Sequence, residues 1–215
     1  MKLNKYYYKE VPTSYTPKKI IDAKEKTTAV VFTLLSFVFA VLAFIVVYLI
    51  KPFSVKELRS DLTSFLIADL CFIALVFVYV VMHELTHGVG FKIFTSEKLK
   101  FGVTLTVAFC GAPTAYVKKW PAIITTLLPF IVYSIVFLLV YFLTGNMYIQ
   151  AISGLLFAIH FGGCIGDFYV SLYLLLKGKS DMLVNDDGAK QVFYEYNPKM
   201  IDEGDNNEGD ISTES

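Results

Sequence analysis

The segment VVMHELTHGVGF, residues 80–91, holds the residues best suited to chemistry. His83 and His87 are four positions apart, so on a helix both imidazoles project from one face. That spacing suits a single tetrahedral zinc ion. Glu84 is rotated off the metal axis and could take a proton from a zinc-bound water, whose pKa zinc lowers to about 7. This H-E-x-x-H arrangement predicts a hydrolytic zinc site.

A third protein ligand is needed if water is to occupy the fourth position on zinc. The extended metzincin pattern is excluded, because Ile93 stands where its third histidine should be. The remaining candidates are His160, Asp167, Asp186, Asp187 and Glu195. We favour Asp167, since it is the only acid or base besides His160 in residues 120–176. An unpaired charge there would be costly, and metal coordination removes that cost.

His160 lies seven residues before Asp167, about 10 Å away along a straight helix. Both therefore cannot bind one metal unless the helix breaks at Gly162 and Gly163. We predict that His160 takes part in catalysis as a hydrogen-bonding or transition-state partner. The alternative is a structural histidine whose hydrogen bonds are made within a contact between helices. The NDDG segment, 185–188, predicts a turn or a helix start before it predicts a ligand.

The composition of the chain around the motif predicts a membrane protein. The chain has 215 residues, 55% of them hydrophobic and 18% charged, whereas about 25% are charged in a typical soluble domain. About 20 apolar residues in a helix cross the hydrocarbon core. We predict an all-α integral membrane protein with four transmembrane helices at about 27–50, 62–94, 120–143 and 149–176.

A small β-hairpin is possible between the second and third helices. Residues 99–107 alternate apolar side chains with polar or small ones, which is a strand period. The CGAP segment, 110–113, indicates a turn, and TAYV, 114–117, could return as a second strand. The alternative is an irregular amphipathic loop on the membrane surface.

Four segments follow from this pattern: a polar arm (1–26), a four-span zincin-like domain (27–180), a polar segment (181–199) and an acidic tail (200–215) that we predict to be disordered. The arm carries seven lysines and residues 92–119 carry five, against three Lys or Arg in 51–61 and none in 144–148. This distribution predicts a cell-membrane protein with both termini in the cytoplasm. The formal net charge of zero gives no case for a nucleic-acid partner.

The chain resembles a family of membrane zincin peptidases that was long catalogued as a domain of unknown function and is distantly similar to the site-2 intramembrane proteases. The likeness covers roughly residues 60–197. It lies in HELTHGVGFKIF, KLKFGV, LLPF, HFGGCIGDFYV and NDDGAKQVFYEY. The resemblance implies zinc held by His83, His87 and Asp167, with Glu84 as the catalytic base. The N-x-x-P…D-G motif of site-2 proteases is absent, so the kinship to them is indirect.

The primary hypothesis is a membrane-embedded zinc metalloprotease that hydrolyses peptide bonds in or next to a membrane segment. Its partners would be the lipid bilayer and a peptide or membrane-protein substrate. A second hypothesis is a non-catalytic zinc-binding adaptor or regulator. A third is a transporter in which Asp69 joins the site residues as a relay group, although no inverted repeat supports it.

Overall fold

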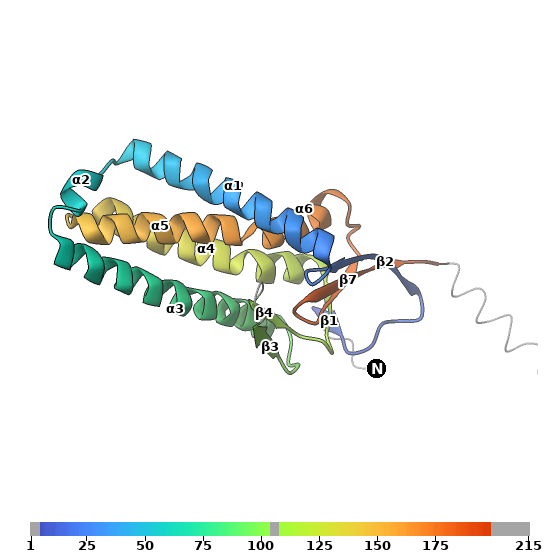
Figure 1. Ribbon diagram of the computed structural model, residues 1–215. Coiled ribbons are helices and arrows are strands. Elements are labelled where there is room, and N and C mark those ends of the chain that lie inside the picture. Colours follow the sequence, from blue (N-terminus) through green and yellow to red (C-terminus); the bar gives the residue numbers. More distant parts are fainter. Residues whose placement is uncertain (1–4, 104–107, 199–215) are drawn as a thin grey trace, which may run out of the picture.

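A bundle of helices with β-sheet at one end makes up the fold (Figure 1). The computed structural model describes residues 5–103 and 108–198. The helices are α1 (Lys26–Ile50), α2 (Val55–Leu58), α3 (Leu62–Phe94), α4 (Lys119–Leu143), α5 (Met147–Gly163) and α6 (Ile165–Leu176). α1, α3 and α4 are each long and apolar enough to cross a membrane, and α5 with α6 forms a bent pair that could be a fourth span. Their bounds follow the four predicted spans closely.

The bounds of these helices follow from local chemistry. Asp61 is the N-cap of α3, and its side chain accepts hydrogen bonds from the amides of Thr63 and Ser64. Asn146 is the N-cap of α5 and accepts hydrogen bonds from the amides of the first turn in the same way. Such caps satisfy amides that have no partner within the helix.

The prediction of an all-α fold is wrong, because the described residues also form seven strands. A five-stranded sheet has the order β1-β5-β6-β7-β2, and β3 pairs with β4 separately. The strands are β1 (Tyr7–Tyr8), β2 (Tyr15–Asp22), β3 (Lys100–Val103), β4 (Ala108–Gly111), β5 (Tyr116–Lys118), β6 (Leu183–Asp186) and β7 (Lys190–Tyr196). The polar arm and the segment after α6 pair with each other, β2 with β7, over a long antiparallel register.

A β-hairpin does lie between α3 and α4, but its second strand is not the predicted one. β3 pairs with β4 from Lys100↔Gly111 to Val103↔Ala108. The predicted return strand, TAYV, instead supplies β5, which pairs with β1 and β6. Part of the predicted first strand, 104–107, lies outside the described residues, as does the predicted acidic tail.

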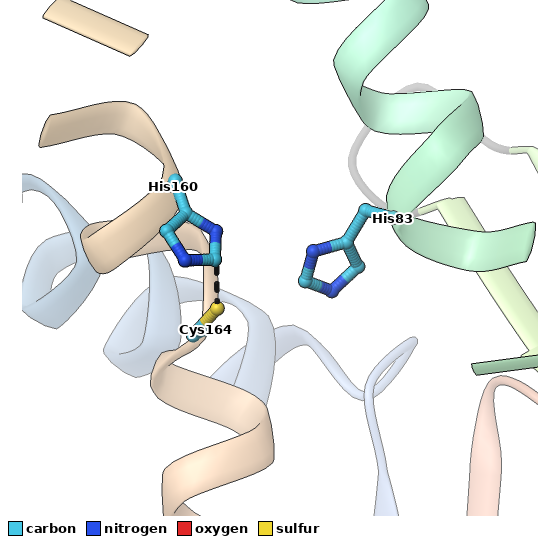
Figure 2. A group of neighbouring side chains, drawn as sticks. All are labelled: His83, His160 and Cys164. Carbon is cyan, nitrogen blue, oxygen red and sulfur yellow. Dashed lines mark hydrogen bonds between the residues drawn. The ribbon is translucent and has the colours of Figure 1, made fainter. Parts of the chain in front are cut away.

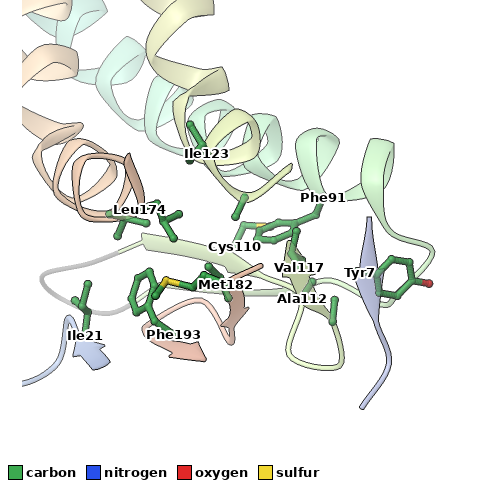
Figure 3. Packing of buried hydrophobic residues seen from close by; sticks show 14 residues of the cluster. Tyr7, Ile21, Phe91, Cys110, Ala112, Val117, Ile123, Leu174, Met182 and Phe193 are labelled. Carbon is green, nitrogen blue, oxygen red and sulfur yellow. The ribbon is translucent and has the colours of Figure 1, made fainter. Parts of the chain in front are cut away.

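One apolar core fixes the five-stranded sheet to the ends of the helices (Figure 3). Phe193 of β7 and Leu174 of α6 are fully buried in it, together with Met182. Because β1, β2 and β7 belong to this sheet, both ends of the described chain lie at the same end of the bundle (Figure 1). The C-terminal end of α3, which carries the HELTH motif, points toward the same end.

The fourth apolar segment is broken next to Gly162 and Gly163, where the sequence had left a break open. α5 ends at Gly163, Cys164 follows, and α6 begins at Ile165 with a bend of 44°. Gly162 lies against α1 so closely that a Cβ there would be 2.3 Å from the carbonyl oxygen of Ser36. The break changes the direction of the chain between His160 and Asp167.

Candidate metal centre

Three of the predicted site residues converge at one point. His83 and His87 come from α3, and Asp167 comes from the first turn of α6. The Nε2 atom of His83 lies 3.4 Å from Oδ2 of Asp167, and Nε2 of His87 lies 3.4 Å from its Oδ1. One donor atom from each residue falls within 4.8 Å of the other two. The two imidazoles are nearly buried, and the Asp167 side chain is 19% exposed.

The carbonyl oxygen of Thr125 fixes the orientation of His87. This oxygen lies 3.1 Å from Nδ1 of His87, and since a carbonyl can only accept, Nδ1 carries the proton. In an uninterrupted helix the same oxygen would bond to the amide of residue 129. That residue is Pro129, which has no amide hydrogen, so the carbonyl is free for the imidazole.

A glycine on α3 allows this contact between helices. A Cβ at Gly90 would lie 3.0 Å from the Cα of Thr125. Glycine therefore lets α4 approach α3 closely enough for the Thr125 carbonyl to reach His87, which lies one turn earlier than Gly90 on α3.

The three converging groups fit a zinc ion. With Nδ1 bound to the Thr125 carbonyl, neutral His87 would present the lone pair of Nε2 toward a carboxylate oxygen, an arrangement that a cation between the two groups would complete. Ligands at about 2.0–2.1 Å from a tetrahedral zinc are about 3.3–3.4 Å apart, close to the two measured N–O distances. Two imidazoles and one carboxylate form the donor set typical of catalytic zinc sites.

A second group of potential ligands shares His83 and adds His160 and Cys164 (Figure 2). In this group His83 faces the other two residues from α3, whereas they lie at the end of α5 and at the break. The Tyr79 hydroxyl lies between the two imidazoles, 3.1 Å from Nδ1 of His83 and 2.8 Å from Nδ1 of His160. Since these nitrogens already have partners, the group with Asp167 is the better metal site.

Glu84 stands beside the metal group and lines the same cleft. The cleft has a volume of ≈ 810 Å³ and is bordered by His83, Glu84, His87 and Asp167 together with mostly apolar side chains. Glu84 is half-buried, and the backbone amide of Cys110 on β4 contacts its carboxylate. The hairpin therefore covers the side chain predicted as the base. Burial raises the pKa of the Cys110 thiol to about 12, so this cysteine is not a nucleophile at neutral pH.

The other candidate carboxylates have partners away from the metal group. Asp186 lines the cleft, but it accepts hydrogen bonds from the amide of Gly188 and the side chain of Gln191, each at 2.7 Å. Burial raises its pKa to about 7 in spite of these bonds. Glu195 pairs with Lys18 and Lys179 on the sheet. The remaining candidate, Asp187, accepts a hydrogen bond from the amide of Lys190 in the β6–β7 turn.

His160 lies behind the metal group and not among its ligands. It is fully buried, and its Nε2 lies 3.2 Å from the carbonyl oxygen of Phe130 and 3.1 Å from Oγ of Ser134. Sequence reasoning missed Tyr79, which joins His160 to His83. The sequence did contain a sign of this contact, because Tyr79 is four positions before His83 and therefore lies on the same helix face.

A comparison with models of known protein families finds a match. Residues 76–182 match the family model described as "Putative zincin peptidase". This match confirms the resemblance to the zincin peptidase family, and the matched segment contains His83, Glu84, His87, His160 and Asp167. No curated protein and no solved structure matches the chain, so the similarity to site-2 proteases has no support from these comparisons.

Proposed function

We propose that this protein is a membrane-embedded zinc metalloprotease that hydrolyses peptide bonds in or next to a membrane segment. The observation that carries the proposal is the convergence of His83, His87 and Asp167 beside Glu84, within a segment that matches the zincin peptidase family. The apolar length of α1, α3 and α4 supports the membrane setting. Cytoplasmic placement of both termini stays a prediction.

The roles of the site residues follow from their chemistry. His83, His87 and Asp167 would hold the ion. Zinc held there lowers the pKa of water to about 7 and polarises a carbonyl oxygen as a Lewis acid. Glu84 takes the proton from the attacking water and passes it to the leaving amine, so that one water is consumed for each C–N bond broken.

The cleft also suits an extended, apolar substrate. β3 pairs only with β4 among the described strands, so its other edge is free for a further strand. Peptides often bind such an edge through main-chain hydrogen bonds. A transmembrane helix would have to unwind before it could bind in this way, because its amides are already hydrogen-bonded.

Replacing Glu84 by Gln tests the mechanism. We expect zinc content to stay the same, because Glu84 is not among the converging ligands, and cleavage to fall by about 10²–10⁴-fold, the usual contribution of a general acid–base group. Cleavage would be measured on labelled casein in detergent and on a synthetic apolar transmembrane peptide in liposomes. Asp69→Asn is the matched control, since Asp69 is an exposed acid on the same helix, about 21 Å away from His83.

The outcomes separate the proposed function from its alternatives. Full cleavage by the Glu84→Gln protein would contradict the mechanism. Tight zinc binding by a wild-type protein that cleaves neither probe would favour the zinc-binding adaptor. A proton flux through liposomes that contain the wild-type protein, lost in the Asp69→Asn variant, would favour the transporter.

A further inference from the structure

Two buried polar side chains lie directly behind His83 and have no role in the proposed chemistry. Tyr79 of α3 is 7% exposed, and His160 of α5 is fully buried. The Tyr79 hydroxyl is within hydrogen-bond distance of Nδ1 in both His83 and His160. Buried polar groups of this kind are costly unless each donor meets an acceptor, so the positions of their hydrogens can be worked out.

The protons of His160 are set by α4. Nε2 lies 3.2 Å from the carbonyl oxygen of Phe130, which can only accept, so Nε2 of His160 carries the proton. In the neutral imidazole Nδ1 is then an acceptor. Two donors lie near that nitrogen, the Tyr79 hydroxyl at 2.8 Å and the Cys164 thiol at 3.6 Å. The hydroxyl is the nearer and the stronger donor, so we assign its hydrogen to Nδ1 of His160.

This arrangement determines the proton position on His83. A tyrosine hydroxyl has one hydrogen, and Tyr79 gives it to His160. Toward His83 the Tyr79 oxygen can only accept, so Nδ1 of His83 donates across the 3.1 Å contact. Nε2 of His83 is left with its lone pair, and this nitrogen lies 3.4 Å from Asp167.

We propose that Tyr79 and His160 are positioning residues that hold His83 as the tautomer able to bind the metal through Nε2. This inference rests on the proposed zinc site and adds residues that act on it from behind. The chain of hydrogen bonds runs from Phe130 through His160 and Tyr79 to His83. This chain of hydrogen bonds does for His83 what the Thr125 carbonyl of α4 does for His87, which it holds in the same tautomer.

The packing around these two residues leaves them little freedom to rearrange. The Tyr79 ring makes edge contacts with Tyr133, Phe137 and His160, with centroids 5.5–5.6 Å apart. The Phe130 ring stacks on His160 at 5.8 Å. Because Phe can keep the ring contacts of Tyr79, Tyr79→Phe removes the hydroxyl and little else.

Zinc affinity of the purified full-length chain, measured by competition with a chelator in detergent, tests the proposal without relying on activity. Outer hydrogen-bond partners of metal ligands typically contribute 10–100-fold to affinity, so we expect Tyr79→Phe to weaken zinc binding by about that factor. Cobalt substitution should report the same change as an altered visible absorption spectrum. Tyr133→Phe is the matched control, because the Tyr133 ring is also near His83 but its hydroxyl donates to the carbonyl of Met82.

His160→Leu provides a second test of the same chain of hydrogen bonds, in case Tyr79→Phe folds poorly. We expect it to weaken zinc binding as Tyr79→Phe does, and to add little in the Tyr79→Phe background, since both remove the same chain of hydrogen bonds. Wild-type zinc affinity and cobalt spectrum in folded Tyr79→Phe and His160→Leu proteins would overturn the inference while leaving the zinc site intact. A wild-type chain that binds no zinc would overturn the proposed function as well.

Discussion

Two polar clusters among the described helices differ in how their donors and acceptors are matched. At the end near α2, the Tyr141 cluster consists of Tyr141, Gln150 and Lys51. Tyr141 and Gln150 both donate to the carbonyl of Lys51, and the Lys51 ammonium donates to the carbonyl of Thr144. At the metal centre, Nε2 of His87 faces a carboxylate oxygen, while its Nδ1 is bound to the Thr125 carbonyl. The polar groups of the first cluster pair with one another, whereas the second brings two imidazoles and a carboxylate together in the arrangement of a zinc site.

This difference shows that a buried polar group is not in itself a sign of function. Both clusters place polar side chains among apolar helices, where ionisable groups are expensive. Of the two, the metal centre is the one that brings together side chains of the types that bind zinc. We therefore expect changes at the Tyr141 cluster to affect stability and changes at the metal centre to affect metal binding.

The largest effect should come from Asp167→Asn. The new side chain has nearly the same shape but no negative charge, so it neutralises no cation. We expect zinc affinity to fall by more than the 10–100-fold typical of outer partners, with little zinc left after dialysis. Metal content would be measured by elemental analysis. Asp186→Asn is the control on the same cleft; if it removed the zinc and Asp167→Asn did not, the assignment of the third ligand would be wrong.

A smaller effect on a different quantity is expected from Tyr141→Phe. The hydroxyl of this fully buried residue donates at 2.7 Å to the carbonyl of Lys51, which also accepts from Gln150. Its loss should lower the free energy of unfolding by about 1 kcal/mol, the net value of one hydrogen bond. Zinc affinity should not change. Thermal unfolding in detergent and chelator competition would give the two values, and a loss of zinc here would contradict the distinction between the clusters.

The helices, and the side chains that converge at the candidate metal centre, were easier to predict from the sequence than the sheet, for a physical reason. Apolar length and the four-residue spacing of His83 and His87 are local properties, and Asp167 was conspicuous as the only acid in its apolar segment. The pairing of β2 with β7 joins residues about 170 positions apart. β7 also pairs with the adjacent β6, but β2 has no partner nearby in the sequence, so nothing local predicts a strand in the polar arm.

The hydrogen bonds behind the ligands could be predicted only in part. Pro129 lies inside α4 and frees the carbonyl of Thr125, but a sequence cannot tell which group binds the carbonyl that a proline frees. That depends on how α3 and α4 pack at Gly90. Similarly, Gly162 and Gly163 made a break conceivable, but the position of His160 behind Tyr79 depends on the direction of α5.

The smallest effect is expected from Pro129→Ala, which tests the role of the Thr125 carbonyl. Pro129→Ala restores an amide hydrogen at position 129, which can bond to the carbonyl of Thr125 and compete with Nδ1 of His87. We expect zinc affinity to fall by about threefold, or ~0.7 kcal/mol, within the range for one hydrogen bond. The metal-free protein should be no less stable, because alanine favours a helix interior.

Pro121→Ala is the matched control for this variant. Pro121 lies in the first turn of the same helix, where a missing amide hydrogen frees no carbonyl of α4. Zinc affinity should therefore stay at the wild-type value. Equal losses from the two proline variants would mean that helix bending, and not the Thr125 carbonyl, sets the affinity. A loss of zinc affinity confined to Pro129→Ala would show that a backbone group on α4 contributes to the metal centre. The backbone carbonyls of the Tyr141 cluster, by contrast, should contribute to stability and not to zinc affinity.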